Sequence, residues 1–306
     1  MKILVTGITG YVGGALAPRL VAEGHDVRGL ARDPARCLVD DVPCVRGDAV
    51  TGAGLDEALD GVDVAYYLIH SMETGAQEGF ATREERSAAN FAAAAVRAGT
   101  PRIVYLGGPV PQGAAISPHL ASRLAVERTL LEAVPRSVAL RASVVVGARS
   151  RSFRFLVRLV ERMPFIPLPP WSASRTRPID GRDVLAFLTS AATVDEVAGR
   201  SLDIAGPDVL TWGEMIERIR DLLILGRPGF RLPISLTGVA SRVSAAIAGE
   251  DPEFIGALMG SLGHDLLPRD DDAARLLGVR LHRFDRAVEH ALREWEELEP
   301  GTVAAR

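Results

Sequence analysis

The sequence predicts an α/β protein with a Rossmann-type, doubly wound parallel sheet and a smaller, mostly helical carboxyl-terminal lobe. Three observations predict it. Short apolar or β-branched runs alternate with segments of helical periodicity through the first half of the chain, which is typical of a parallel sheet covered by helices on both faces. A glycine-rich segment at residues 6–13 follows the first of these runs. Four prolines between residues 164 and 170 then end the regular alternation.

Six strands and four helices are expected in the first half. The strands are short and apolar, as expected for strands buried on both faces; they are Ile3–Thr6, Asp26–Ala31, Pro43–Arg46, Val62–Leu68, Arg102–Leu106 and Ser137–Arg141. The helices are Tyr11–Ala22, Leu55–Ala58, Phe80–Ala98 and Pro118–Ala133. Ser117 is the expected N-cap of the last helix, because Pro118 stands at its first helical position.

The second half predicts a series of helices. Asp183 is the expected N-cap of a helix over Val184–Ala192, and Thr211 with Glu214 matches a capping box that opens a helix to about Leu223. The other expected helices are Ser152–Arg162, Leu236–Ala248, Pro252–Leu262 and Phe284–Trp295. Residues 297–306 are expected to be a frayed tail.

Composition and charge favour a small-molecule partner. The chain has 306 residues, 47% hydrophobic, with 35 basic against 39 acidic side chains, so it shows no electrostatic footprint for nucleic acid. No apolar run reaches the roughly 18 residues of a membrane span. Met1 and Lys2 lead directly into the first strand with no signal-peptide pattern, and a cytoplasmic location is expected. The oligomeric state is not indicated.

Lysine and cysteine usage restricts the chemistry further. Lys2 is the only lysine, so no lysine is available in the body of the chain. Cys37 and Cys44 lie seven residues apart with no CxxC pattern and no histidine at metal-ligand spacing. We expect free thiols in a reducing compartment and no metal site.

The glycine-rich segment has the pattern of a dinucleotide-binding turn. Gly7, Gly10 and Gly13 are spaced GxxGxxG between the first strand and the first helix, where backbone N–H groups can bind a diphosphate. The alternative is an ordinary glycine-rich turn between a strand and a helix. The cofactor-binding residues predicted here are Thr6, Gly7, Thr9, Gly10, Tyr11, Val12 and Gly13.

The ends of the second and third strands bear on the choice of dinucleotide. Arg32 follows the second strand, where a guanidinium can pair with a 2′-phosphate, so NADP(H) is favoured over NAD(H). The adjacent Asp33 leaves NAD(H) open, because a carboxylate there can bind a ribose hydroxyl. Asp48, after the third strand, is a candidate for binding adenine, or else a turn-capping residue.

Residues 1–147 are therefore predicted to be an NAD(P)-binding domain. Residues 148–306 form the substrate-side lobe, with 175–206 as candidates for a return to the sheet.

Taken together, these motifs resemble the atypical, NmrA-like branch of the short-chain dehydrogenase/reductase superfamily. The resemblance spans roughly residues 1–220 and includes the runs 65–72, 104–108, 117–127, 140–142 and 177–184. It implies that further cofactor contacts come from the ends of the fourth and fifth strands, at Leu68, Ile69, Leu106 and Gly107. It also places Arg141 near the mouth of the site, with Arg175, Arg177, Asp183 and Trp171 as further candidates, each with an ion pair, cap or core role as the alternative.

Activity in this superfamily requires a Tyr-x-x-x-Lys pair, which this chain lacks. On the corresponding helix His119 stands in place of the tyrosine and Arg123 in place of the lysine, which keeps both on one helical face. His119 is thus a candidate acid or base and Arg123 a candidate for binding the nicotinamide ribose. His70, at the end of the fourth strand, is a second catalytic candidate. The alternative for all three is a structural role.

Three functions remain open. The first is an NADPH-dependent oxidoreductase that acts on a small apolar carbonyl, quinone or enone. The second is a non-catalytic NADP(H)-binding sensor or scaffold, as some NmrA-like proteins and a complex I accessory subunit are. The third is an epimerase or isomerase that retains its cofactor.

Overall fold

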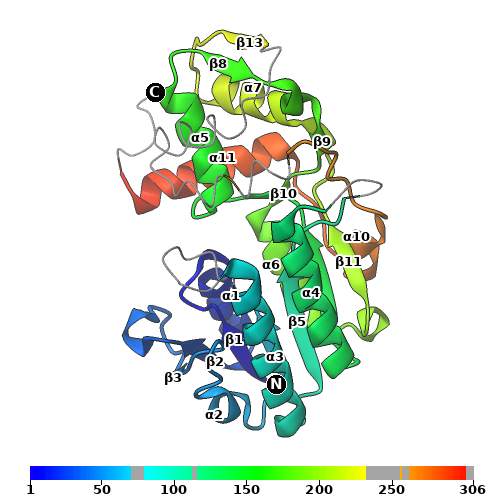
Figure 1. Ribbon diagram of the computed structural model, residues 1–306. Coiled ribbons are helices and arrows are strands. Elements are labelled where there is room, and N and C mark those ends of the chain that lie inside the picture. The colour runs from blue at the N-terminus through cyan, green and yellow to red at the C-terminus, as the bar shows by residue number, and fades with distance from the viewer. Residues whose placement is uncertain (70–78, 112–115, 232–255, 257–261, 301–306) are drawn as a thin grey trace.

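A seven-stranded parallel sheet forms the larger half of the molecule, and a smaller lobe lies at one end of it (Figure 1). The computed structural model describes residues 1–69, 79–111, 116–231, 256 and 262–300. The strand order is β11-β6-β5-β4-β1-β2-β3, and every pairing is parallel. The bounds are β1 (Lys2–Thr6), β2 (Asp26–Ala31), β3 (Cys44–Arg46), β4 (Val64–Tyr67), β5 (Arg102–Gly107), β6 (Val138–Ala142) and β11 (Ser201–Ile204).

Helices cover both faces of this sheet. Side chains alternate between faces along a strand, so Ile3 and Val5 pack in one buried cluster and Leu4 in another. Tyr66 and Tyr67 divide between the same two clusters. The first face is covered by α1 (Tyr11–Ala22), α6 (Gly181–Ala191) and α10 (Asp272–Leu276), and the second by α2 (Leu55–Leu59), α3 (Phe80–Ala98) and α4 (Pro118–Ala133).

The predicted fold class is confirmed, and all six predicted strands are present with ends shifted by no more than two residues. The seventh strand is β11, which pairs with β6 at the edge of the sheet. It was not predicted as a strand because Ser201–Ile204 is only four residues long, alternates Asp203 with apolar residues, and follows a turn rather than a long helix. Its segment falls within residues 175–206.

The smaller lobe is built around a third buried cluster. This cluster joins α5 (Arg151–Arg162), α7 (Trp212–Leu222) and α11 (Phe284–Leu298). The predicted capping box at the start of α7 is confirmed, because Thr211 Oγ1 accepts from Glu214 N–H and the Glu214 carboxylate accepts from Thr211 N–H. Short pairs β7 (Val145–Val146) with β10 (Ile179–Asp180), β8 (Ile166–Leu168) with β13 (Gly229–Arg231), and β9 (Arg175–Thr176) with β12 (Leu210–Thr211) connect these helices, together with the 3-10 turns η2 (Pro170–Ala173) and η3 (Asp195–Val197).

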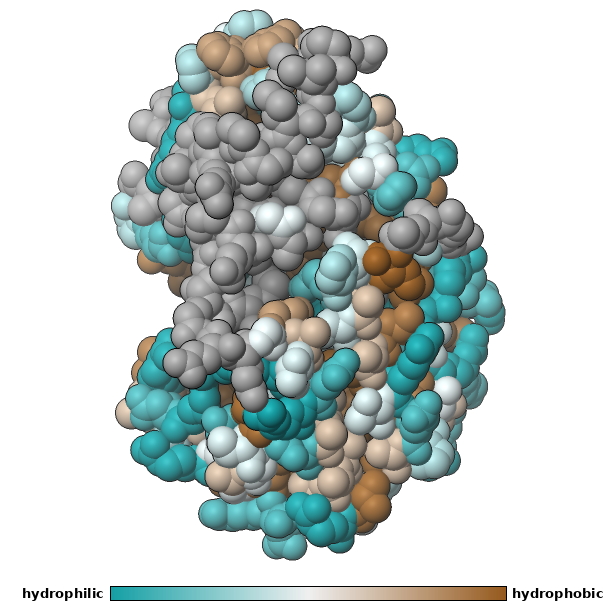
Figure 2. Space-filling view, viewed as in Figure 1, coloured by the Kyte–Doolittle hydropathy of each residue, from teal (hydrophilic) through white to brown (hydrophobic). Residues whose placement is uncertain are grey.

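Two expected helices, Leu236–Ala248 and Pro252–Leu262, lie outside the described residues except at Gly256 and Leu262. At the carboxyl end α11 continues through Leu298, so the frayed tail was predicted to begin too early. On the face shown in Figure 2, hydrophilic residues cover much of the sheet-containing half, and hydrophobic ones occur among them in small groups.

Asp183 is not the N-cap of α6. The helix begins at Gly181, and the Asp180 carboxylate accepts from Arg182 N–H at 2.8 Å, which makes Asp180 the cap. Asp183 is instead buried, and its carboxylate accepts from the backbone N–H of His282 at 2.8 Å and lies 2.6 Å from that histidine's Nδ1. The prediction failed because both aspartates have an N-cap composition and only the buried contact with His282 distinguishes them.

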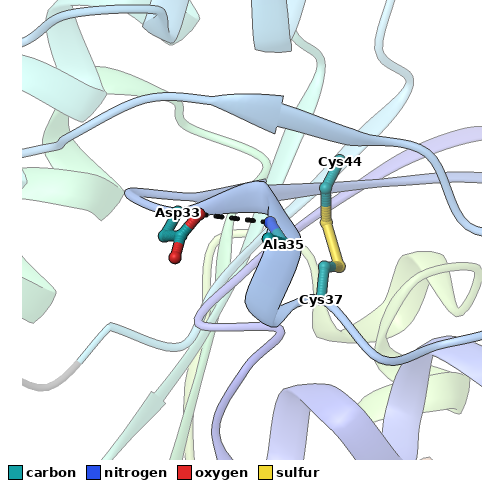
Figure 3. Close-up of a disulfide and its surroundings, with 4 residues drawn as sticks. All are labelled: Asp33, Ala35, Cys37 and Cys44. Atoms are coloured by element: carbon teal, nitrogen blue, oxygen red, sulfur yellow. Dashed lines mark hydrogen bonds between the residues drawn. A yellow bond between two sulfur atoms is a disulfide. The ribbon is translucent and has the colours of Figure 1, made fainter.

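The expectation of free thiols is also wrong, because Cys37 and Cys44 form a disulfide (Figure 3). The 3-10 turn η1 (Pro34–Arg36) follows β2, and the Asp33 carboxylate caps it by accepting from Ala35 N–H at 3.3 Å. This turn brings Cys37 beside Cys44 on β3, with their Cα atoms 6.6 Å apart. A spacing of seven residues does not reveal this, since the proximity depends on the pairing of β2 with β3.

Removing the disulfide is expected to destabilise the protein by about 2 kcal/mol, because the cross-link restricts a short loop in the unfolded chain. The double variant Cys37→Ser/Cys44→Ser should unfold at a lower urea concentration than the oxidised protein. Dithiothreitol should lower the midpoint of the oxidised protein and leave that of the double variant unchanged. Equal midpoints for the oxidised protein, the dithiothreitol-treated protein and the double variant would contradict the presence of the disulfide.

Candidate active site

An open cavity of about 720 Å³ lies at the carboxyl-terminal edge of the parallel sheet. Its walls include residues that directly follow β1, β2, β3, β4, β5 and β6, together with residues of the smaller lobe. Ligands of open α/β sheets bind at this edge, near the point where the strand order reverses. In this sheet that point lies between β1 and β4, and the glycine-rich turn follows β1.

The glycines of this turn are required by its geometry. Gly7 has a φ of +64°, and a Cβ there would lie 2.6 Å from the carbonyl oxygen of Leu68. A Cβ on Gly13 would overlap the Gly7 carbonyl, so α1 can approach β1 this closely only with glycine. Gly10 is the N-cap of α1 and offers no side-chain cap, and the first turn of α1 holds no acidic residue. The N–H groups at this helix end are therefore available to an anion such as a diphosphate.

Most of the predicted cofactor-binding residues line this cavity. They are Gly7, Thr9, Gly10, Tyr11, Val12, Gly13, Arg32, Asp48, Leu68, Ile69, Leu106 and Gly107. Thr6 does not line it. Its side chain is fully buried, where the hydroxyl donates to the carbonyl of Tyr66 and accepts from Leu68 N–H. Thr6 thus links the end of β1 to β4 and holds the start of the glycine-rich turn from inside the core.

One end of the cavity carries the residues expected near the adenosine. Arg32, which directly follows β2, and Arg36, the last residue of η1, have exposed side chains that line the wall. Asp33 is absent from this wall, because its carboxylate caps η1. Asp48 lines the cavity, while one of its carboxylate oxygens accepts from Val50 N–H at 2.8 Å. The charged side chains at this end of the cavity are thus two arginines and one carboxylate.

His119 and Arg123 lie one turn apart on α4, and both line the cavity. The His119 ring is half-buried, with its centroid 5.6 Å from that of Phe80. Burial, and then the positive charge of Arg123, lower the pKa of His119 from 6.5 to about 4. His119 is therefore neutral at pH 7, with one ring N–H to donate. His70, the other catalytic candidate, lies outside the described residues.

The four tyrosines offer no obvious replacement for the missing acid. Tyr66, Tyr67 and Tyr105 are core residues, and burial raises the pKa of each, for Tyr105 to about 12. Tyr11 does line the cavity, but its hydroxyl lies against Gly147 and Gly181, where no Cβ would fit. Burial also raises the pKa of Tyr11. On α4, the neutral His119 therefore brings one ring N–H, a hydrogen-bond donor, to the cavity wall.

The residues expected at the mouth of the site lie elsewhere. Arg141 is buried, and its guanidinium donates hydrogen bonds to both carboxylate oxygens of Glu127 at 2.8 and 2.6 Å. It joins β6 to α4 and does not line the cavity. Arg175 pairs with Asp265, and Arg177 pairs with Asp271 and donates to the Gly206 carbonyl. Trp171 packs against the core of the smaller lobe, and Asp183 lines a separate pocket with His282.

Several cavity residues were not predicted. Ser143 directly follows β6, so the rule that sites form at strand ends could have identified it. Thr176, Trp212 and the turn Arg149–Ser152 come from the smaller lobe, whose position relative to the sheet no local pattern reveals. Arg83, on α3, is a further lining residue.

Among the residues that the structure describes, no group of three or more histidine, cysteine or acidic side chains is arranged to hold a metal ion. Within the same residues, no helix combines the length and apolar character needed to cross a membrane.

Comparisons with known proteins agree with this geometry. The (4-alkanoyl-5-oxo-2,5-dihydrofuran-3-yl)methyl phosphate reductase of Streptomyces griseus subsp. griseus is 32% identical over 270 residues, which cover 85% of each chain. The ceramide reductase of Caulobacter vibrioides is 27% identical over 218 residues, covering 70% of this chain and 68% of that one.

Solved structures show the same fold. The UDP-glucuronic acid 4-epimerase of Bacillus cereus, in complex with UDP-glucuronic acid and NAD, is similar with a TM-score of 0.72 at 16% identity, covering 97% of this chain and all of that one. The sequence pattern of the NmrA-like family matches residues 1–157, the part that holds the glycine-rich turn, α4 and the first six strands. The resemblance predicted from the sequence is thus confirmed, and the chain belongs to the NmrA-like family.

Proposed function

We propose that the protein is an NADPH-dependent reductase of a small conjugated carbonyl compound, a quinone or an enone. The family, the fold and the two reductase relatives support an NAD(P)-dependent oxidoreductase-type function. The observation that carries the finer proposal is that one cavity holds the glycine-rich turn, Arg32 and the pair His119 and Arg123.

The residues present fit a nicotinamide dinucleotide. The free N–H groups at the start of α1 match a diphosphate, and Arg32 and Arg36 match a 2′-phosphate at the end of β2. Leu68, Ile69 and Leu106 give the middle of the cavity an apolar wall. Arg123, which lines the same cavity, is proposed to hold the nicotinamide ribose, the role that the resemblance assigns to its helix position. When bound, NADPH supplies the hydride.

The neutral His119 determines which substrates suit this site. Reduction of a carbonyl places negative charge on oxygen, and a ring N–H donated by His119 stabilises that charge. An imidazole with a pKa of about 4 is a poor source of a full proton at pH 7. A quinone or enone spreads the charge over its π-system, so a hydrogen bond suffices and water can supply the proton. The name of the Streptomyces griseus relative describes a substrate of this class, in which carbonyl groups are conjugated with a ring double bond.

Two other functions compete with this proposal. The lack of a Tyr-x-x-x-Lys pair favours a non-catalytic NADP(H) sensor or scaffold. A neutral histidine beside the cofactor site also suits proton abstraction in an epimerase or isomerase.

The purified protein should oxidise NADPH in the presence of a panel of quinones and enones. The reaction is measured as the decrease in the absorbance of the reduced nicotinamide. Tight NADPH binding with no turnover on any member of the panel would overturn the reductase proposal and favour the sensor. Isotope exchange at a substrate carbon without net NADPH oxidation would favour the epimerase.

The cofactor preference has its own test. Arg32→Gln is expected to weaken NADPH binding by about tenfold or more, through loss of a charged pair with the 2′-phosphate, and to change NADH binding less than twofold. Arg28→Gln is the matched control, because Arg28 lies on β2 but not in the cavity wall. Equal losses for NADPH and NADH in Arg32→Gln would contradict a role in 2′-phosphate binding.

A further inference from the structure

One side of the cavity is formed by residues beyond β6 and β7 together with the smaller lobe. We call it the distal wall; it comprises Ser143, Val144, Val145, Arg149–Ser152, Thr176, Trp212, Leu262 and Leu266. In the sheet, β6 lies on the opposite side of β1 from β2 and β3. The distal wall is therefore far from the adenosine end at Arg32 and Asp48, and it faces the space left for a substrate.

The distal wall offers hydrogen-bond donors that the protein itself does not use. Trp212 is only 1% exposed, and among the described residues its Nε1 has no hydrogen-bond partner. Buried donors of this kind are rare in folded proteins unless a ligand or water satisfies them. The hydroxyls of Ser143 and Thr176 lie 3.0 Å apart and share one hydrogen bond. Two hydroxyls hold two protons, so one proton is not used in this bond.

The charge of the distal wall is positive. Arg149 and Arg151 stand at the start of α5, whose first turn contains no acidic residue. The described residues of the wall include no carboxylate. Arg149 is exposed, and no hydrogen bond or ion pair joins it to another residue in the described part of the chain. Arg149 lines the cavity, so its positive charge is available on this wall.

The rest of the distal wall is apolar. Its apolar side chains are those of Val144, Val145, Leu262 and Leu266. A ligand that matches this wall has an apolar body and an acidic group that accepts hydrogen bonds. The cofactor diphosphate already has donors of its own in the glycine-rich turn and the start of α1, so the charge at Arg149 is left for a second anion.

We propose that the distal wall binds an acidic group of the substrate, a carboxylate or a phosphate, between Arg149 and the Trp212 indole N–H. The conjugated, apolar part of the substrate then packs against Val145 and Leu266, on the side toward His119. This proposal rests on the proposed reductase function for the identity of the ligand as a substrate. It adds one feature to the proposed substrate, an acidic group beside the conjugated carbonyl.

The test compares trans-3-benzoylacrylate, an enone with a carboxylate, with its uncharged ethyl ester. The wild-type protein should reduce the acid with a kcat/KM at least tenfold above that of the ester. Arg149→Gln should raise KM for the acid about tenfold, with the ester and the Kd of NADPH unchanged. Trp212→Phe keeps the ring and removes the N–H, and it should weaken the acid selectively. Arg128→Gln, an exposed arginine of α4 outside the cavity, removes the same charge and should change nothing.

A second readout does not depend on turnover. Benzoate and phenyl phosphate are titrated calorimetrically into the complex with NADP⁺, and the tighter of the two identifies the acidic group. Binding that Arg149→Gln weakens about tenfold supports the distal wall even if no enone is reduced, in which case only the reductase proposal fails. The distal-wall proposal is overturned if neither acid binds, if acid and ester are reduced equally well, or if Arg149→Gln weakens NADPH binding by the same factor, which would assign Arg149 to the cofactor.

Discussion

Gly10→Val is expected to reduce NADPH affinity at least 100-fold while the protein remains folded. Gly10 is exposed at the start of α1 and has φ −87° and ψ 176°, a backbone conformation that valine adopts readily. Its side chain would cover the N–H groups that are free to bind the diphosphate, and its Cβ would lie 3.1 Å from the Gly7 carbonyl oxygen. Isothermal titration of NADPH, with a thermal melt of the same sample, measures both effects.

Gly226→Val is the matched control, because nothing lies within 4 Å of a Cβ at Gly226 and it does not line the cavity. It should bind NADPH like the wild-type protein. If Gly10→Val bound NADPH with unchanged affinity, the glycine-rich turn would not be the diphosphate site.

His119→Phe is expected to lower kcat for quinone or enone reduction about 100-fold, because it removes the N–H donated to the developing oxygen charge. Phenylalanine keeps the ring packing against Phe80, so the Kd of NADPH should stay within twofold. The wild-type kcat should show no titration of His119 between pH 5.5 and 8, since the pKa of this residue is about 4. Steady-state rates across this range, with NADPH saturating, provide the measurement.

The lowered pKa also affects stability. Between pH 6.5 and 4 the unfolded chain binds a proton at His119 that the folded protein does not. The contribution of His119 to the free energy of unfolding therefore decreases as the pH falls through this window.

The controls for the rate are two further variants. His119→Gln keeps a side-chain N–H and should recover part of the lost rate, and His290→Phe, outside the cavity, should have no effect on the rate. Full activity of His119→Phe would show that His119 has no part in the reaction.

The sequence was most informative where local rules determine structure. The glycine-rich turn, the capping box at Thr211 and the burial of the strands on both faces depend on neighbouring residues, and each is present where it was predicted. Strand ends point toward one edge of a parallel sheet, so Arg32, Asp48, Leu68 and Leu106 could be assigned to one cavity before the fold was known.

The sequence was least informative where distant segments meet. Arg141 has the position of a site residue, but its guanidinium is held by Glu127 of α4, fourteen residues away in the chain. Cys37 meets Cys44 only because β2 and β3 pair. Trp171 was the candidate for the cavity wall, but the packing of the smaller lobe brings Trp212 there instead. Such choices depend on tertiary contacts that no window of sequence contains.

The central claim is that the cavity at the end of β1 binds a nicotinamide dinucleotide. Isothermal titration calorimetry of the wild-type protein with NADPH, NADP⁺, NADH and NAD⁺ tests it most directly. The account predicts saturable binding of one nucleotide per chain, with NADPH and NADP⁺ tighter than their counterparts that lack the 2′-phosphate. Absence of binding heat with all four, together with an unchanged melting temperature, would contradict it.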